Sequence, residues 1–165
     1  MYKRQLEAVK IAKESSTNIL SIVNHLNSSL AQESSLVMGL NCGPEIGVAA
    51  TKSFTSQLTI LYEITDKLCN GCINPDWEKV SSTVSQILSD NSKIKEISKE
   101  LKDVTDIYVL GRGIHLPIAR EAALKLKELS YIHAEGIAGG ELKHGPLALM
   151  DSNVFVIIIL SLIHI

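Results

Sequence analysis

The stretch that decides the fold is residues 106–149, DIYVLGRGIHLPIAREAALKLKELSYIHAEGIAGGELKHGPLAL. It opens with the apolar run 107–110, which lies between a charged residue and a Gly-Arg-Gly turn, and this pattern predicts a buried strand. Pro117 then falls where the first turn of a helix tolerates proline, because the N–H groups of that turn have no intrahelical partner. Apolar residues follow at helical spacing and predict one apolar stripe: Ala119, Ala122, Leu126 and Leu129.

The same predicted helix carries a second, charged stripe. Glu121, Lys125 and Glu128 recur at i, i+4 and i+7, which places a carboxylate, an amine and a second carboxylate side by side. From spacing alone, the pattern favours a solvated ion pair between Lys125 and Glu128. A helical carboxylate is also the group that a sugar isomerase uses to move a proton between adjacent carbons, if a second group helps to open the ring.

A candidate for that second group lies in the glycine-rich segment 136–146, GIAGGELKHGP, which contains His144. Glycines let a backbone approach a ligand closely, and the Gly-Pro pair after the histidine restricts where its side chain can point. A helical carboxylate with a positioned imidazole suits proton-shuttling sugar chemistry. Taken alone, His144 would be structural, which remains the interpretation for His25, His115 and His133.

The rest of the chain alternates between strand and helix patterns. Strands are predicted at 18–23, 35–40 and 154–160, with a capped turn or short helix at 27–30, and helices at 6–14 and 49–68. Two more helices are predicted after residue 75: one capped by Asp76, and one around Ile94 and Ile97. A strand, a short helix and a second strand predict a parallel sheet with crossover connections. We therefore expect an α/β fold of parallel sheets flanked by helices.

The start of the predicted helix 49–68 is rich in hydroxyl groups, which are contributed by Thr51, Ser53, Thr55 and Ser56. Exposed N–H groups at the N-terminus of a helix suit a polar or anionic ligand. Further along, the helix presents apolar side chains on one side, namely Phe54, Leu58, Leu61 and Leu68. The helix therefore has a candidate binding end and an apolar side.

Bulk composition narrows the range of partners. A formal charge of −2 and a pI near 6.2 give no electrostatic reason to expect nucleic acid or an acidic membrane surface. The longest apolar run, 154–160, is far too short to span a bilayer, so no membrane span is expected. The turn at 111–113 begins like a dinucleotide fingerprint, but the third glycine would fall at Leu116, so that pattern fails.

The cysteines point to no metal site. Cys69 and Cys72 form a CxxC pair, but a structural zinc ion needs four ligands and no second pair is visible. We expect two thiols in a surface linker and no role for Cys42. Three cysteines without a disulfide framework suit a reducing cytoplasm.

Two blocks of sequence carry a family resemblance. LGRG at 110–113 and EAALKLKELSYIHAEGIAGGELKHGPLAL at 121–149 resemble the second sugar-isomerase (SIS) domain of the glutamine–fructose-6-phosphate aminotransferases, the glucosamine-6-phosphate synthases. CGPEIGVAATKSFTSQ at 42–57 is similar to the end of their first SIS domain. The resemblance implies a flavodoxin-like, SIS-type fold in two incomplete domains, 6–68 and 76–159, joined by a linker at 69–75.

The resemblance also implies roles for particular residues. Glu128 matches the base that shuttles the proton during isomerisation, and Lys125 matches a lysine beside the sugar. His144 matches a histidine that assists ring opening and reaches the site from the neighbouring subunit. The backbone at Val48 matches a contact to the sugar, whereas Ala50 stands where the family often has a substrate-contacting serine. One hydroxyl contact is therefore expected to be missing.

For the parent protein, the resemblance implies conversion of fructose 6-phosphate and glutamine to glucosamine 6-phosphate and glutamate, as a homodimer without a metal or organic cofactor. The family's glutaminase domain, phosphate-binding loops and C-terminal lysine tail have no counterpart in these 165 residues, so the chain alone is expected to be inactive. The alternatives are a glutamine-independent amino-sugar-phosphate deaminase or deglycase, and a non-catalytic sugar-phosphate sensor.

The two ends do not fit the family pattern that adjoins them. Residues 1–5, MYKRQ, and 160–165, LSLIHI, are similar to translations, in opposite orientations, of a transposon-end adapter used in sequencing libraries. We expect both to be adapter scars and exclude them from the fold prediction. The genuine segment would then be residues 6–159, cut from a longer gene at both ends.

Overall fold

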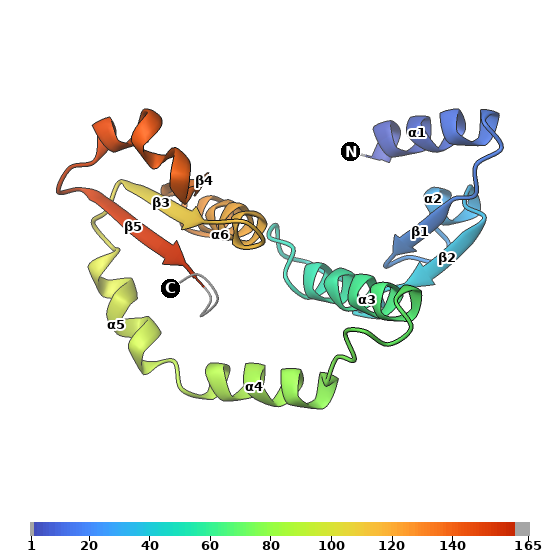
Figure 1. Cartoon of the computed structure of the whole chain (residues 1–165), viewed down its shortest axis with the longest axis horizontal. Helices are drawn as coiled ribbons and strands as arrows, with labels where there is room; N and C mark the ends of the chain where they lie inside the picture. Colours follow the sequence, from blue (N-terminus) through green and yellow to red (C-terminus); the bar gives the residue numbers. More distant parts are fainter. Residues whose placement is uncertain (1, 161–165) are drawn as a thin grey trace. The chain divides into compact units, whose positions relative to one another are not determined.

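The computed structural model describes residues 2–160, so all but Leu160 of the suspected scar at 160–165 lies outside the described residues. The chain divides into two compact units, with the boundary between Trp77 and Glu78. Figure 1 labels the helices and strands. Both units contain a parallel sheet flanked by helices, so the predicted α/β class is confirmed.

Unit 1 is built on a pair of short parallel strands. Its elements are α1 (Tyr2–Glu14), β1 (Leu20–Val23), α2 (Ser29–Gln32), β2 (Leu36–Gly39) and α3 (Lys52–Leu68). The register places Leu20 opposite Leu36, and α2 forms the crossover between the two strands. The hydroxyl of Ser28 caps α2 by accepting a hydrogen bond from the N–H of Ala31 at 3.3 Å. α1 begins four residues before the predicted helix and includes residues 2–5.

Unit 1 buries little apolar surface. Its buried apolar residues, from α1, α2 and the β2–α3 region, are Val9, Ala31, Leu40 and Ala49. The predicted apolar side of α3 is largely uncovered, because Leu61 is 49% exposed and Leu68 is 80% exposed. Helix α3 therefore presents apolar surface that nothing in unit 1 covers.

Unit 2 contains a three-stranded parallel sheet with strand order β4-β3-β5. Its elements are α4 (Trp77–Ser89), α5 (Ser92–Glu100), β3 (Asp106–Gly111), α6 (His115–Ser130), β4 (His133–Ala138), the 3₁₀ helices η1 (Gly139–His144) and η2 (Pro146–Leu149), and β5 (Val154–Ile159). α4 begins at Trp77, which is also the last residue of unit 1. Asp106 pairs with both His133 and Val154, so β3 is the central strand. No residue of α4 or α5 is buried.

The core of unit 2 lies between α6 and the sheet. Five buried residues form it: Ile107, Val109, Ala119, Ala123 and Ala134. Ala122 and Leu126 pack at its edge, but Leu129 is 64% exposed, so its predicted place in the helix's apolar stripe does not make it part of the core. At 100° per residue, Leu129 lies about 80° around the helix from Ala119, whereas Ala123 lies only about 40° away. Ala123 therefore takes the core position.

Two glycines allow α6 to approach the sheet closely. A Cβ atom at Gly136 of β4 would lie 2.5 Å from the Cα of Arg120, and one at Gly111 would lie 2.3 Å from the carbonyl oxygen of His115. Both atoms that the added Cβ would contact belong to the backbone of α6, so a side-chain rotation cannot relieve the clash. Glycine at these positions therefore sets the distance between the helix and the strands.

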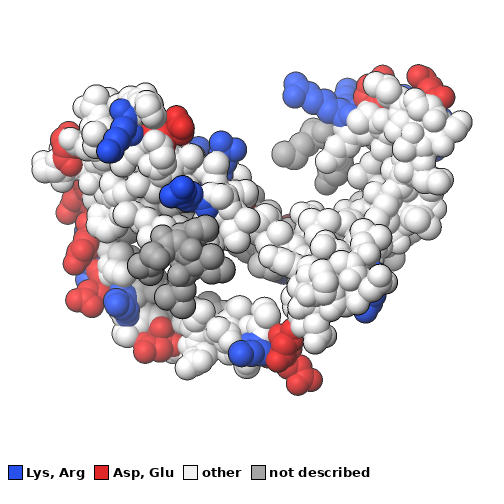
Figure 2. All heavy atoms as spheres, in the orientation of Figure 1, with Lys and Arg blue, Asp and Glu red and all other residues white. Residues whose placement is uncertain are grey.

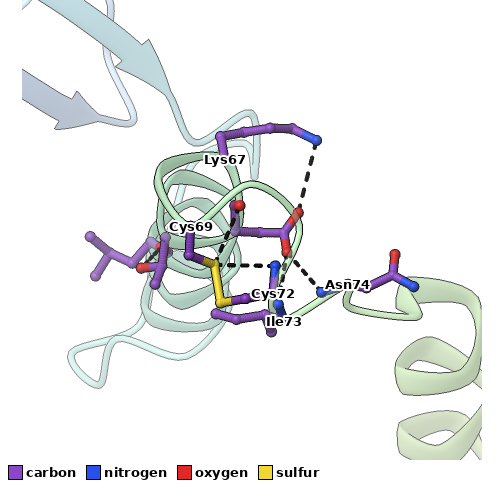
Figure 3. Close-up of a disulfide and its surroundings, with 8 residues drawn as sticks. Lys67, Cys69, Cys72, Ile73 and Asn74 are labelled. Atoms are coloured by element: carbon purple, nitrogen blue, oxygen red, sulfur yellow. Dashed lines mark hydrogen bonds and ion pairs between the residues drawn. A yellow bond between two sulfur atoms is a disulfide. The ribbon is translucent and has the colours of Figure 1, made fainter.

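The prediction of two free thiols at the CxxC pair is wrong. Cys69 and Cys72 form a disulfide with a Cα–Cα distance of 5.4 Å (Figure 3). Cys42 is the free cysteine. The chain folds back after α3 because Asn70 and Gly71 take left-handed conformations, with φ of 55° and 81°. That turn brings the two sulfur atoms together, which the spacing alone did not predict.

Candidate functional site

The charged stripe predicted on α6 is present as a three-residue cluster. The ammonium of Lys125 donates a hydrogen bond to Oε2 of Glu128 at 2.5 Å and lies 3.5 Å from Oε1 of Glu121. The three side chains are between 23% and 28% exposed, so they are only partly accessible to solvent. The sequence prediction of side-by-side carboxylate, amine and carboxylate groups is therefore confirmed.

The electrostatics of this cluster centre on the lysine. The pKa of Lys125 is raised above its ordinary value, chiefly by the hydrogen bond that it donates to Glu128. Desolvation opposes that shift, while the negative charges of Glu128 and Glu121 support it. Lys125 is therefore a fixed cation between two carboxylates, and it orients the Glu128 carboxyl group.

His144 lies elsewhere in unit 2. It is the last residue of η1, and its side chain is exposed. In Figure 1, η1 and η2 lead back from the end of β4 to the start of β5. The histidine is therefore part of the crossover connection between the two outer strands of the sheet.

The topology separates His144 from the α6 cluster within one chain. α6 connects β3 to β4 in one direction across the sheet, and the η1–η2 connection runs in the opposite direction, past β3 to β5. Because crossovers between parallel strands are right-handed, connections that run in opposite directions lie on opposite faces of the sheet. Glu128 and His144 therefore belong to opposite faces, and a single chain does not bring them together through its sheet.

The two remaining predicted site residues lie in unit 1. Val48 and Ala50 belong to the loop between β2 and α3; Val48 is 89% exposed, and Ala50 is exposed as well. Their neighbour Ala49 is buried at 6% exposure and anchors this loop. The backbone around Val48 is thus accessible to a ligand, as a main-chain contact to a sugar requires.

Sequence reasoning assigned no role to Glu45, which interacts with the start of α3. One carboxylate oxygen accepts hydrogen bonds from the N–H of Thr51 at 2.7 Å and from its hydroxyl at 3.1 Å, and the other accepts from the hydroxyl of Ser53. The end of α3 predicted to suit an anionic ligand thus binds an anionic side chain of the same chain. The sequence feature that could have indicated this contact is an acidic residue shortly before a helix start rich in hydroxyl groups.

Glu45 and Ser53 also line a cavity of about 370 Å³ in unit 1. Its other polar lining residues are Gln5 of α1, Asn24 and His25 after β1, Ser28 at the start of α2, and Gln57 of α3. Apolar residues of β1 and its surroundings, including Ile22 and Leu40, complete the wall. Pockets of this kind, with a few polar groups on an apolar wall, are typical of small-molecule sites.

The Glu45 contacts predict a specific acid response. The hydrogen bonds from Ser53 and then from the Thr51 N–H lower the pKa of Glu45 from 4.5 to about 2. A lowered pKa in the folded chain stabilises the loop above pH 4.5, and this contribution is lost as the pH falls towards 2. A carboxyl-detected NMR titration is expected to give a midpoint near 2 for Glu45. In Ser53→Ala the midpoint is expected to move towards 4.5, and an unchanged midpoint would contradict the assignment.

The described residues contain neither a metal-binding cluster nor a membrane-spanning helix. Among residues 2–160, no group of three or more His, Cys, Asp and Glu side chains is arranged to hold a metal ion. None of the helices in that range is both long and apolar enough to cross a bilayer. On the face drawn in Figure 2, acidic groups follow the outer edge of unit 2, and basic groups lie mostly inward of them.

Comparison with known proteins identifies the class to which this fold and these site residues belong. The SIS domain family matches residues 3–64 and 100–161, which is more than half of the chain. The chain therefore belongs to the SIS domain family. The stretch between the two matched segments, 65–99, contains the end of α3, the α3–α4 connection, α4 and most of α5, and no residue of α4 or α5 is buried.

Within this family, the chain is similar to particular enzymes. It is 43% identical over 164 residues to the glutamine–fructose-6-phosphate aminotransferase (isomerizing) of Thermococcus kodakarensis, with 93% of this chain and 27% of that enzyme covered. The chain thus spans about a quarter of the length of that relative. Among solved structures, it is similar to the C-terminal domain of glucosamine-fructose-6-phosphate aminotransferase from Francisella tularensis, with a TM-score of 0.77 and 41% identity over 93% of this chain and 46% of that one.

A second solved structure comes from a different kind of enzyme. The glucosamine-6-phosphate deaminase of Thermotoga maritima matches with a TM-score of 0.70 and 25% identity, over 93% of this chain and 47% of that one. Both structures share the SIS-type arrangement of parallel strands and helices, and identity to the aminotransferase is the higher of the two.

Proposed function

We propose that this chain is the isomerase region of a glutamine–fructose-6-phosphate aminotransferase, in which 6–68 ends one SIS domain and 76–159 begins the next. The substrate would be fructose 6-phosphate, and the whole protein would form glucosamine 6-phosphate with nitrogen from glutamine. The observation that supports this most is the Lys125–Glu128 contact on α6, in a chain 43% identical to the Thermococcus relative. The cytoplasm is the proposed compartment, because the substrates are ordinary metabolites; the Cys69–Cys72 disulfide removes the support that the cysteines gave from the sequence alone.

The α6 cluster supplies the proton chemistry of the proposed isomerisation. The Glu128 carboxylate would remove a proton from one sugar carbon beside the carbonyl or imine carbon and return it to the neighbouring carbon. Lys125 donates a hydrogen bond to one oxygen of that carboxylate, which leaves the other oxygen to face the substrate. His144 would protonate the ring oxygen as the C–O bond breaks, and the anomeric hydroxyl would lose its proton to solvent and become the carbonyl of the open-chain sugar.

The proposed chemistry requires two copies of the chain. Glu128 and His144 belong to opposite faces of the β4-β3-β5 sheet, so one chain does not place both on one sugar. A second copy would bring its His144 to the Glu128 of the first, and a two-fold axis would form two equivalent sites. We therefore propose a homodimer with active sites shared between the subunits.

The loop of unit 1 would contribute sugar contacts through its backbone. Val48 is exposed and would offer main-chain groups, but Ala50 has no hydroxyl group. Losing one hydrogen bond is worth about 0.5–1.5 kcal/mol, so binding would be weakened several-fold without a change of reaction class. Since the chain covers 27% of the Thermococcus relative, we expect no turnover by the 165-residue chain alone.

A chimera tests the proposal directly. In the chimera, this chain replaces the matching segment of the Thermococcus relative, and it is given fructose 6-phosphate and glutamine. The expected result is glucosamine 6-phosphate and glutamate in equal amounts, measured by chromatography of both products. The unmodified Thermococcus enzyme serves as the positive control.

Two other outcomes would contradict the proposal and support the rivals. Release of ammonia from glucosamine 6-phosphate, without use of glutamine, would favour a deaminase or deglycase, the activity named for the Thermotoga structure. Sugar-phosphate binding without any product, in a chimera that folds, would favour a non-catalytic sensor. Binding is measured by calorimetry, so that a sensor is distinguished from a chimera that simply fails to bind.

A further inference from the structure

A second organised feature lies at the end of α3, in the α3–α4 connection, residues 69–76 (Figure 3). Cys69 directly follows the helix and forms the disulfide with Cys72, whose N–H donates to the Cys69 sulfur at 3.3 Å. The N–H of Cys69 donates to the carbonyl of Thr65 at 3.0 Å, and that of Gly71 to the carbonyl of Asp66 at 2.8 Å. The disulfide turn therefore satisfies carbonyl groups at the end of the helix.

The side chain of Asp66 fixes the residues that follow the disulfide. Asp66 is only 6% exposed, and its Oδ1 accepts hydrogen bonds from the N–H of Ile73 at 3.1 Å and of Asn74 at 2.7 Å. Its Oδ2 lies 3.9 Å from the ammonium of Lys67. A buried carboxylate needs such donors, because desolvation without them is costly. Asp66 and the disulfide therefore both restrain the same short segment, residues 69–74.

Further along, the connection is held to α3 a second time. The indole N–H of Trp77 donates to a carboxylate oxygen of Glu63, and its ring lies 6.5 Å from that of Tyr62 in an edge-to-face arrangement. Trp77 is the single tryptophan of the chain. The segment between the disulfide and Trp77 is therefore bounded by two attachments to α3, and the second has a built-in fluorescent reporter.

We propose that the Cys69–Cys72 disulfide and the Asp66 hydrogen bonds together form a redox-controlled clasp on the α3–α4 connection. Oxidised, it holds residues 69–74 against α3. Reduced, it releases the amides of Ile73 and Asn74 from Asp66, while Trp77 stays attached. Residues 69–74, which belong to unit 1, would then change from a fixed turn to a flexible segment.

The reaction is thiol–disulfide exchange with a dithiol reductant. A thiolate of the dithiol attacks Sγ of Cys72, the more exposed of the two cysteines, and Cys69 leaves as a thiolate. The second thiol of the reductant then displaces Cys72 and forms the reductant's own disulfide. Two electrons pass to the cysteine pair, and each cysteine sulfur gains one proton. The reduced state acquires a new contact, since the Cys69 sulfur lies 3.5 Å from the Asp66 carbonyl and gains a hydrogen to donate.

The disulfide closes a turn that the end of α3 also stabilises. Asn70 is left-handed, with φ of 55°, as is usual for the residue that follows a helix, and its N–H donates to the carbonyl of Lys67 at 3.3 Å. These hydrogen bonds end at Gly71, so the disulfide is the covalent link that keeps Cys72 and the residues after it beside the helix. Once the bond is broken, residues 73 and 74 gain conformational freedom, which opposes their hydrogen bonds to the Asp66 carboxylate.

Hydrogen exchange of the 165-residue chain tests the clasp, in a Cys42→Ser background that leaves only this pair of cysteines. Oxidised chain is compared with chain reduced by dithiothreitol, and free thiols are counted to verify each state. Exchange of the Ile73 and Asn74 amides is expected to become at least tenfold faster on reduction. Amides in the middle of α3 and the Trp77 emission are expected to stay unchanged, because the helix and its second attachment remain.

Two results would overturn the proposal. Equal exchange in both states would mean that Asp66 holds the segment without the disulfide. Faster exchange throughout α3 with an altered Trp77 emission would mean that reduction unfolds unit 1 instead of opening a turn.

Variants separate the two components of the clasp. Asp66→Ala removes the acceptor and is expected to exchange rapidly at residues 73 and 74 in both redox states, and a persistent redox response in this variant would contradict the proposal. The double variant Cys69→Ser, Cys72→Ser keeps Asp66 and is expected to match the reduced chain. If Asp66→Ala does not fold, the test rests on the double variant, and protection of its residues 73 and 74 equal to that of the oxidised chain would overturn the proposal.

Discussion

In the chimera with the Thermococcus relative, Glu128→Gln is expected to lower kcat by about 10²–10⁴-fold, the range that a general acid or base contributes. Glutamine keeps the size of the side chain and accepts a hydrogen bond from Lys125, but it does not take up a proton from carbon. Substrate binding should change little, so the loss should appear in kcat and not in KM. Steady-state kinetics with fructose 6-phosphate and glutamine measure both constants.

Glu121→Gln is the matched control, because Glu121 flanks the same ammonium on the same helix. Its oxygen lies 3.5 Å from Lys125, against 2.5 Å for Glu128, and the two side chains have nearly equal exposure. This variant removes a comparable negative charge and is expected to retain most of the activity. Equal losses of activity in the two variants would show that activity depends on the charge balance around Lys125 and does not depend on a base at Glu128.

Mixing two inactive variants tests whether the site is shared. Chimeras carrying Glu128→Gln or His144→Ala would each be nearly inactive, but dimers formed from both would contain one site with both groups intact. Random mixing should restore about a quarter of the unsubstituted activity, since half of the dimers are mixed and each has one of two sites complete. No recovery, with exchange of subunits demonstrated, would place both residues in the site of one chain.

Gly136→Ala is expected to destabilise unit 2 by about 3 kcal/mol, at the upper end of the cost of overpacking. The new Cβ would lie 2.5 Å from the Cα and 2.7 Å from the N of Arg120, and also close to the backbone of Ala119. α6 would have to move away from β4 and open the core at Ala119 and Ala134. Hydrogen exchange at the Val109 amide, in the central strand, should accelerate at least a hundredfold.

Gly139→Ala is the control for this substitution. A Cβ at Gly139 would meet nothing within 4 Å, so the variant should leave exchange at Val109 nearly unchanged. Both glycines lie in the same glycine-rich segment, and only one faces α6. Similar destabilisation by the two variants would mean that the backbone flexibility of glycine stabilises both positions, and that the close approach of α6 is not the cause.

Much of the secondary structure was predictable because its signals are local. The apolar run 107–110 became β3, the run 154–160 became β5, and Ser28 caps the short helix between β1 and β2. Each of these signals depends on residues close together in the sequence, such as a short apolar run or a side chain that reaches a nearby N–H. Helix ends were less accurate, and α3 begins at Lys52 where a start at residue 49 was predicted.

The errors occurred where contacts between distant residues decide the outcome. Leu129 satisfied the periodicity of an apolar stripe, but it is the sheet below α6 that selects Ala123 for the core. The CxxC pair was predicted as two thiols because spacing does not show that Asn70 and Gly71 turn the chain back on itself. No role was predicted for Glu45, because its hydrogen bonds with Thr51 and Ser53 form only when the loop between them folds.

The sequence by itself determined that Glu121, Lys125 and Glu128 form one charged row, since residues three and four apart on a helix are neighbours in any tertiary context. Only the tertiary structure decided how that row relates to His144. The strand order β4-β3-β5 makes two successive connections run in opposite directions, and so puts the carboxylate and the imidazole on opposite faces. Strand order depends on pairing between residues far apart in the chain, and no local pattern encodes it.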